Sequence, residues 1–290
     1  MIENEQNRIA NDLVLIGGGH SHLILIMQFS KKTIQGTRIT LISDEMDIPY
    51  SGMIPGFIEG TYSWRESHID LYKLTQRLNI RFINSKVIKI SSKNKEVHLN
   101  DRPTIKFDVL SINSGIQSNY NNIKGAKKYC VPVKPISRLA NNFFNEIKDT
   151  NAIAFIGGGA GAVELALALR KRYIIDKPHL KITIITGKNG LLSSFPKQTK
   201  QTSKNALKKV SIDIIENTEV VEVKHNKIIM LDKKILNVDK CILSTNAMAP
   251  NWLKKSVIKL NNKGFIVSLL NTTDAADDGL RVGGGGGRVR

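Results

Sequence analysis

One pattern occurs twice in this chain, and it limits the folds that the sequence can adopt. An apolar run leads into three glycines and then into a helix-compatible stretch in LVLIGGGHSHLILIMQF (13–29), and again in AIAFIGGGAGAVELALALR (152–170). Gly17 and Gly157, the first glycine of each copy, lie 140 residues apart. Self-similarity of this kind indicates two copies of one supersecondary unit.

The similarity continues downstream in the same order. Each copy goes on to a second strand, a strand–turn–strand segment, and an acidic residue followed by a closing strand. Apolar strands that alternate with helices are typical of parallel sheets covered on both faces. The sequence therefore predicts an α/β fold with two tandem Rossmann-like domains. The paired segments are RITLIS (38–43) with KITIIT (181–186), LNIRFINSKVIKI (78–90) with VSIDIIENTEVVEV (210–223), and FDVLSINSG (107–115) with VDKCILSTN (238–246).

The glycines of each copy have the chemistry of a dinucleotide site. A G-x-G-x-x-G/A pattern between a strand and a helix permits a tight turn, lets the backbone approach a pyrophosphate and directs the helix N-terminus at its charge. The second copy fits through Gly157, Gly159 and Ala162, whereas the first has a histidine in the third position. The candidate cofactor-binding residues of the two turns are Gly17, Gly18, Gly19, His20, His22, Gly157, Gly159, Ala160 and Ala162.

His20 and His22 raise the alternative of a metal site. A metal ion would need further ligands, and the remaining histidines form no ligand cluster in the sequence. We therefore predict no metal site and place both residues at a helix start beside a phosphate. There, His22 either increases the distance between helix and strand or donates a hydrogen bond to a phosphate oxygen. The remaining histidines are His68, His98, His179 and His225.

The residues after the second strand of each copy indicate which dinucleotide is bound. A carboxylate at this position accepts hydrogen bonds from a ribose. Asp44 and Glu45 supply it in the first copy and can serve an adenosine ribose. The second copy has Thr186 and Lys188 instead, and a lysine without a carboxylate favours a 2′-phosphate. This favours NADPH over NADH only weakly, because lysine is common throughout the chain.

Composition excludes several other classes. The formal net charge is +18, but the lysines are scattered and no basic–aromatic stretch occurs, so we expect no nucleic-acid partner. No apolar run reaches the length of a membrane span and the N-terminal residues lack a signal-peptide core, so we expect a cytoplasmic protein. Cys130 and Cys241 stand far apart without a C-x-x-C motif, which argues against a disulfide framework, a zinc site and a dithiol redox motif.

The first glycine turn and three further motifs together are typical of one family. They are GGGHSH (17–22), SDEMDIPYSGMIPGFIEGTY (43–62), HIDL (68–71) and VPVKPI (131–136). With the two dinucleotide units, they make the chain resemble the two-dinucleotide-binding flavoproteins, and within them the type II NADH dehydrogenases. It is most similar to the FAD-containing NADH dehydrogenase-like module that occurs alone or fused to selenophosphate synthetase, and the resemblance covers about residues 10–265.

The resemblance implies that FAD binds to the first copy and NAD(P)H to the second. It also implies hydride transfer from NAD(P)H to FAD, and onward transfer of the electrons to a quinone or another acceptor. It places Pro55 in a loop beside the isoalloxazine, with a plain Pro/Gly turn as the alternative, and Gly115 and Asn246 against cofactor. Glu164 becomes the candidate catalytic residue near the nicotinamide; a first-turn glutamate favoured by the helix dipole is compatible with the same position. Lys134 is either a hinge, a flavin-facing lysine or a solvated charge.

The chain departs from the family pattern at its C-terminal end. The expected apolar run ending in Gly-Asp, whose aspartate holds the flavin ribityl chain, is replaced by a glycine-rich segment, so we expect the C-terminal part of the family fold to be missing. The expected domains are an FAD-binding domain (1–125), an NAD(P)H-binding domain (126–250), a strand returning toward the FAD domain (251–270) and a low-complexity tail (271–290).

This departure keeps three alternatives open. One is a non-catalytic nucleotide-binding or regulatory module, and another is a fragment that serves a selenophosphate synthetase partner. A sulfide:quinone oxidoreductase is the weakest, because neither cysteine is placed to face a flavin. Homodimerisation and peripheral membrane association of the full-length protein also stay open.

Overall fold

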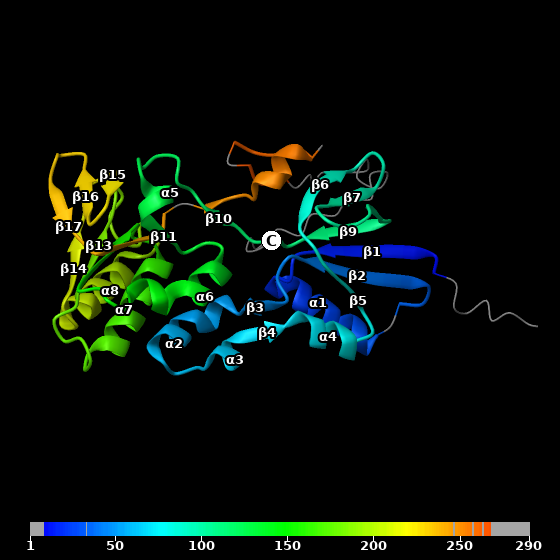
Figure 1. Ribbon diagram of the computed structural model, residues 1–290, viewed down its shortest axis with the longest axis horizontal. Coiled ribbons are helices and arrows are strands. Elements are labelled where there is room, and N and C mark those ends of the chain that lie inside the picture. The colour runs from blue at the N-terminus through cyan, green and yellow to red at the C-terminus, as the bar shows by residue number, and fades with distance from the viewer. Residues whose placement is uncertain (1–8, 33, 246, 257, 263, 268–290) are drawn as a thin grey trace, which may run out of the picture. The chain divides into compact units, whose positions relative to one another are not determined.

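The apolar runs of the repeat form strands that are buried on both faces, as in parallel sheets covered on each side. The computed structural model describes residues 9–267 apart from 33, 246, 257 and 263. The chain divides into two units (Figure 1). The first unit comprises the described residues of Met1–Ile48, His68–Ile116 and Met248–Arg290, and the second comprises those of Pro49–Ser67 and Gln117–Ala247.

The first unit is built on a parallel four-stranded sheet with the order β5-β2-β1-β9. On β1, Leu15 packs in a cluster with Leu23 and Ile26 of α1. Val14 and Ile16 pack in a separate cluster with residues of the antiparallel hairpin formed by β6 (Val87–Ser91) and β7 (Glu96–Leu99). Alternate residues are therefore buried on opposite faces, which explains why the run is apolar throughout. The sheet and its helices are β1 (Asn11–Ile16), β2 (Thr37–Ser43), β5 (Arg81–Asn84), β9 (Val109–Ile112), α1 (His20–Lys31) and α4 (Leu71–Arg77).

A small antiparallel sheet and the segment after residue 250 cover the other face of this sheet. Trp252 and Ile258 pack against its cluster, and the backbone N–H of Ile90 donates to Ser256 Oγ at 2.9 Å. The described residues of the expected return strand, 251–270, form a 3₁₀ helix and one isolated bridge, Leu260↔Ile266; the predicted tail, 271–290, lies outside the described residues. The elements are β6 (Val87–Ser91), β7 (Glu96–Leu99), β8 (Ile105–Lys106) and η3 (Asn251–Lys255).

The second unit repeats this arrangement with one additional strand. Its parallel sheet has the order β11-β18-β12-β13-β14. Phe155 of β12 packs with α6, α7 and α8, whereas Ala154 and Ile156 pack with the hairpin strands and α5. The elements are α5 (Ala126–Tyr129), β11 (Cys130–Pro132), α6 (Ile136–Ile147), β12 (Ala152–Ile156), α7 (Ala160–Tyr173), β13 (Lys181–Ile185), α8 (Lys197–Lys209), β14 (Ile212–Ile215), β15 (Val220–Lys224), β16 (Lys227–Met230), β17 (Ile235–Asn237) and β18 (Lys240–Leu243).

The two sheets have the same topology. β14-β13-β12-β18 repeats the order β5-β2-β1-β9, and the three-stranded sheet β15-β16-β17 corresponds to β6-β7-β8. The backbone N–H of Gly17 donates to Ile42 O at 2.8 Å, and that of Gly157 donates to Ile185 O at 2.9 Å. The prediction of an α/β fold with two tandem Rossmann-like domains is thus confirmed.

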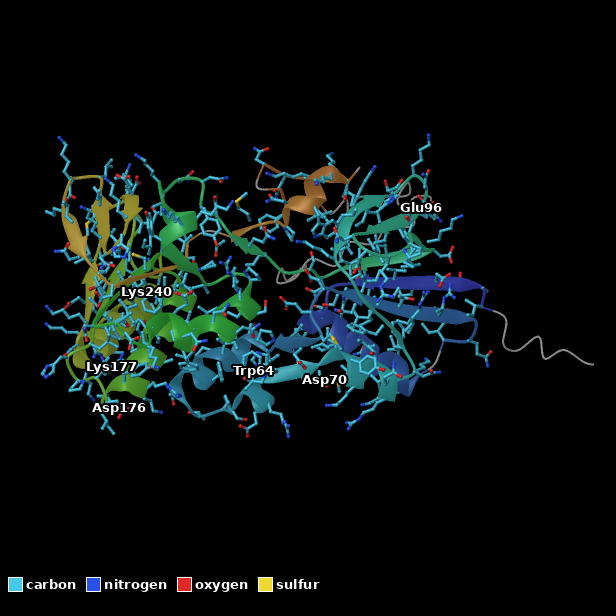
Figure 2. The ribbon with its side chains drawn as sticks, in the orientation of Figure 1. Trp64, Asp70, Glu96, Asp176, Lys177 and Lys240 are labelled. Atoms are coloured by element: carbon cyan, nitrogen blue, oxygen red, sulfur yellow. The ribbon has the colours of Figure 1, made fainter. Side chains whose placement is uncertain are left out.

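One segment of the first half of the sequence belongs to the second unit. Pro49–Ser67 was expected within the first domain, but Ile54, Phe57 and Ile58 are buried in the core around α7. Phe57 contacts Trp64 edge to face, with ring centroids 5.8 Å apart; Trp64 is labelled in Figure 2. Burial of these large apolar side chains explains the assignment. The segment contains η2 (Ser51–Met53), α2 (Ile54–Glu59) and α3 (Trp64–Ser67).

The remaining short strands lie where the chain passes between units, and the helices are of ordinary length. α7 has 14 residues and α8 has 13. Within the described part of the chain, no helix is long and apolar enough to cross a membrane. The short strands are β3 (Asp47–Pro49), β4 (His68–Asp70), β10 (Gln117–Ser118) and β19 (Ala247–Met248).

The acidic residue before each closing strand joins that strand to the first strand of its copy. Asp108 Oδ2 accepts from the backbone N–H of Asp12 at 2.7 Å. Asp239 Oδ2 accepts from the backbone N–H groups of Asn151 and Ala152 at 2.7 and 2.9 Å. Each carboxylate satisfies backbone donors at the start of a central strand, which explains why both copies have an acid at this point.

We expect Asp239→Ala to lower the free energy of unfolding by about 1–2 kcal/mol, because two backbone donors lose their acceptor. Asp239→Asn is the matched control, since the amide oxygen can accept both bonds and should retain most of the stability. Urea unfolding followed by circular dichroism measures the difference. Equal stability of the alanine variant and the parent would contradict this role.

Candidate functional site

The three glycines of the turn between β1 and α1 lie against neighbouring backbone and side-chain atoms that leave no room for a Cβ. Gly17 has φ +90°, and a Cβ there would lie 2.3 Å from the carbonyl oxygen of Asn113. A Cβ on Gly18 would lie 2.5 Å from Leu71 Cδ1, and one on Gly19 2.5 Å from the Asn113 side chain. Gly19 precedes α1 and no side chain caps this helix start. No side chain therefore competes with an anion for the backbone N–H groups at this helix start.

The turn between β12 and α7 has the same construction. Gly157 has φ +118°, and a Cβ there would lie 2.4 Å from the carbonyl oxygen of Ser244. Gly159 precedes α7, which also lacks a side-chain cap. A Cβ on Gly159 would meet nothing within 4 Å. Open space thus adjoins the first helical residue, Ala160, as a pyrophosphate requires.

The third position of the pattern differs between the copies. Ala162 is fully buried, which allows α7 to pack closely on the sheet. His22 is 2% exposed; its Nδ1 donates to the carbonyl oxygen of Gly17 at 2.7 Å, and its Nε2 accepts from Ser111 Oγ at 2.8 Å. Burial lowers the pKa of His22, so the ring is neutral. His22 therefore links the turn to β9 in this geometry and does not direct a nitrogen at a phosphate.

The residues expected to select the dinucleotide lie directly after β2 and β13. Asp44 is exposed beyond the last residue of β2, and the backbone N–H of Glu45 donates to Ser43 Oγ at 3.2 Å. Thr186 follows β13 and is buried, and its Oγ1 has no hydrogen-bond partner among the described residues. A buried hydroxyl without a partner fits a ligand group.

Two glutamates after β14 were missed by the sequence reasoning. Glu219 Oε1 lies 3.7 Å from Lys188 Nζ. Glu216 Oε1 accepts from the backbone N–H of Leu191 at 3.0 Å, and its other oxygen lies 2.5 Å from Lys204 Nζ, an interaction that lowers the pKa of Glu216. The stretch IIENTE contains both acids, but only the parallel pairing of β13 and β14 brings Glu219 to Lys188 and Glu216 to the backbone of Leu191.

Two of the other candidate residues, Glu164 and Pro55, occupy helix positions that differ from the predicted ones. Glu164 is exposed on α7 and is its fifth residue; the first turn of that helix contains no acidic residue, so the helix-dipole interpretation is wrong. Pro55 is in the first turn of α2, in place of a loop. Gly115 has φ +72° and a Cβ there would meet nothing within 4 Å. His20 is the exposed first residue of α1, and Asn246 lies outside the described residues.

No group of three or more His, Cys, Asp or Glu side chains is arranged for a metal ion in the described ranges.

Lys134 is half-buried, its backbone N–H donates to Ser118 Oγ at 3.1 Å, and burial lowers its pKa. A lysine kept in such a place is a candidate functional group, because the charged form is destabilised there.

We expect Lys134→Met to keep or raise the free energy of unfolding at neutral pH. The pKa of Lys134 lies below its ordinary value of 10.5 in the folded chain, so the unfolded chain binds the proton more tightly. Stability of the parent should rise as the pH increases from the lowered pKa toward that value, and the variant should lack this rise. Denaturation across neutral and alkaline pH tests this, with the exposed Lys89→Met as control. Loss of stability at neutral pH in Lys134→Met alone would contradict it.

Comparisons with known proteins identify the family and several relatives of the chain. The family model for pyridine nucleotide-disulphide oxidoreductases matches residues 11–274. The NADH dehydrogenase-like protein YutJ of Bacillus subtilis is 25% identical over 280 residues, which cover 94% of this chain and 75% of that protein. The type II NADH:quinone oxidoreductase of Staphylococcus saprophyticus is 23% identical, over 72% of this chain and 57% of that protein.

A solved structure shows the same fold. NDH2 from Plasmodium falciparum, in complex with NADH, has a TM-score of 0.73 and 20% identity, over 88% of this chain and 58% of that chain. The chain thus spans little more than half the length of two of these three proteins. The family match, which extends over most of the sequence, identifies the chain as a member of the pyridine nucleotide-disulphide oxidoreductase family.

Proposed function

We propose that this chain binds FAD on the first unit and NAD(P)H on the second, and that it serves hydride transfer from the nicotinamide to the flavin. The observation that carries the proposal is the matched pair of glycine turns, each of which leads into a helix without a side-chain cap. Such a turn binds a pyrophosphate through backbone N–H groups and the helix dipole. Flavin and nicotinamide cofactors, when bound, supply the redox chemistry themselves.

On the first unit, one set of residues would bind the pyrophosphate of FAD and another would bind a ribose. The backbone N–H groups at Gly18, Gly19 and His20 would hold the pyrophosphate, and His22 would keep the turn in place through Gly17 O and Ser111 Oγ. Asp44 or Glu45 would accept hydrogen bonds from a ribose hydroxyl. Gly115 would allow close approach of the cofactor to the end of β9, because no atom lies within 4 Å of its missing side chain.

On the second unit, Gly157, Gly159 and Ala160 would hold the pyrophosphate of NAD(P)H. Thr186 would donate its free hydroxyl to the adenosine portion, and Lys188 would favour a 2′-phosphate. The ion pair of Lys188 with Glu219 is exposed and therefore weak, so the lysine can exchange partners. Glu164 is the candidate to contact the nicotinamide from α7.

The proposed acceptor of the electrons is a quinone. Support comes from the similarity to the Staphylococcus type II NADH:quinone oxidoreductase. A nucleotide-binding module without turnover is the alternative, and it predicts cofactor binding without reduction.

The absorbance spectrum of the purified chain tests the proposal. After incubation with FAD and removal of the excess, the chain should show the visible bands of an oxidised flavin. Anaerobic NADH or NADPH should bleach them, and the faster reductant identifies the preferred nucleotide. Flavin bands that persist with both nucleotides would favour the module without turnover. A chain that retains no FAD would refute the flavin assignment.

Two alanine variants distinguish a glycine that the fold requires, Gly157, from a glycine that NAD(P)H binding requires, Gly159. Gly157→Ala should lower the free energy of unfolding by about 2 kcal/mol or more, because of its positive φ and the Ser244 carbonyl. Gly159→Ala should change stability by less than about 1 kcal/mol, since its Cβ enters open space. It should nevertheless weaken NAD(P)H binding by at least about tenfold, or about 1.4 kcal/mol.

Calorimetric titration with each nucleotide measures the binding, and chemical denaturation measures the stability. Unchanged affinity in a folded Gly159→Ala protein would remove the second unit as the nicotinamide dinucleotide site.

A further inference from the structure

The two cysteines, which stand 111 residues apart in the sequence, are direct neighbours in the second unit. Cys130 of β11 and Cys241 of β18 are register partners on adjacent parallel strands. Both are free thiols, and both belong to the cluster on the hairpin side of the sheet. Adjacent strands lie about 4.8 Å apart, which falls within the Cα separation of about 4.4–6.8 Å that disulfides adopt. The separation of the cysteines in the sequence, which argued against a dithiol motif, therefore does not keep them apart in the fold.

The two sulfurs are not equivalent. A hydrogen bond with Cys130, together with burial, raises the pKa of the Cys241 thiol. Cys130 is also the more accessible of the two, with 8% of its surface exposed against 3% for Cys241, and it is the first residue of β11. Cys130 is therefore the sulfur that an incoming reagent reaches first, and as its thiolate it would be the attacking nucleophile.

A cavity leads to these thiols. It has a volume of about 330 Å³, and Cys130 and Cys241 line it. Cys130 is the first residue of β11 and Lys240 the first of β18, so the cavity lies at the amino ends of these strands. The glycine turn at Gly157 follows the carboxyl end of β12, which runs parallel to β18. The cavity is thus at the opposite edge of the sheet from the proposed dinucleotide site.

The cavity has an excess of positive charge. Lys240 Nζ lies 2.6 Å from Glu146 Oε2, so these two charges offset each other. Lys240 is labelled in Figure 2. Arg138, Lys127 and Lys128 also line the cavity, and no carboxylate forms an ion pair with them among the described residues. A basic cavity raises the local concentration of anions.

We propose that Cys130 and Cys241 form a thiol–disulfide site that small anionic organic disulfides reach through this basic cavity. The Cys130 thiolate attacks one sulfur of the small disulfide, forms a mixed disulfide and expels one small thiolate, which takes up a proton. Cys241 then loses its proton and attacks the Cys130 sulfur, which expels the second small thiol. Two protein thiols are oxidised to one disulfide, and the small disulfide is reduced to two thiols. An excess of small thiol reverses the reaction.

The test uses the full chain and one equivalent of 5,5′-dithiobis(2-nitrobenzoate), an anionic disulfide that releases a coloured thiolate. Because the chain has only two cysteines, closure should release two coloured thiolates per chain and leave a monomer lighter by two hydrogens. Cys241→Ser should release one thiolate and retain the adduct. Cys130→Ser should react more slowly than the parent. Retained adducts on the folded parent, or a reaction no faster than in the urea-unfolded chain, would overturn the proposal.

The contribution of the cavity is tested separately with a neutral reagent, 2,2′-dithiodipyridine. Arg138→Gln should slow the anionic reagent by about three- to tenfold and leave the neutral one unchanged. Lys89→Gln, on the exposed side of β6 in the first unit, is the matched control for loss of one positive charge. Equal effects of both variants, or equal effects on both reagents, would refute the role of the basic cavity. The assay needs neither FAD nor a nicotinamide, so its result is independent of the proposed function.

Discussion

The close approach of a glycine to the end of the closing strand is the contact on which both units depend. A Cβ on Gly17 or Gly157 would lie 2.3 or 2.4 Å from the carbonyl oxygen of Asn113 or Ser244. Each unit also has an equivalent backbone hydrogen bond beside this contact: Asn113 N donates to Ile16 O in the first unit, and Ser244 N donates to Ile156 O in the second. The turn, the helix start and the strand end are therefore held together at the edge where parallel sheets bind ligands.

The two copies stabilise this contact by different means. In the second copy the small, buried Ala162 lets helix and sheet pack directly. In the first copy His22 occupies the same place and replaces that packing with hydrogen bonds to Gly17 O and Ser111 Oγ. Both ring nitrogens are satisfied, so burial of this polar ring does not leave an unpaired group. A departure from the glycine pattern is thus compatible with the same turn.

Features set by short-range patterns were predicted well. The order of strands and helices, the two glycine turns and the acid before each closing strand follow from local spacing, and each has a counterpart in the structure. The position of Asp44 after β2 was predictable for the same reason. The helical form of Ile54–Glu59 was not, because Pro and Gly residues there are typical of a turn, whereas burial of Ile54 and Phe57 favours a helix.

By itself the sequence determined the repeat, the fold class and the family, since apolar periodicity and glycine spacing act within each copy. Only the tertiary structure decided three further points: the membership of Pro49–Ser67 in the second unit, the placement of Glu219 beside Lys188, and the pairing of Cys130 with Cys241. Each of these depends on which strands or helices become neighbours. Residues far apart in the chain meet through sheet order and core packing, and neither has a local signature in the sequence.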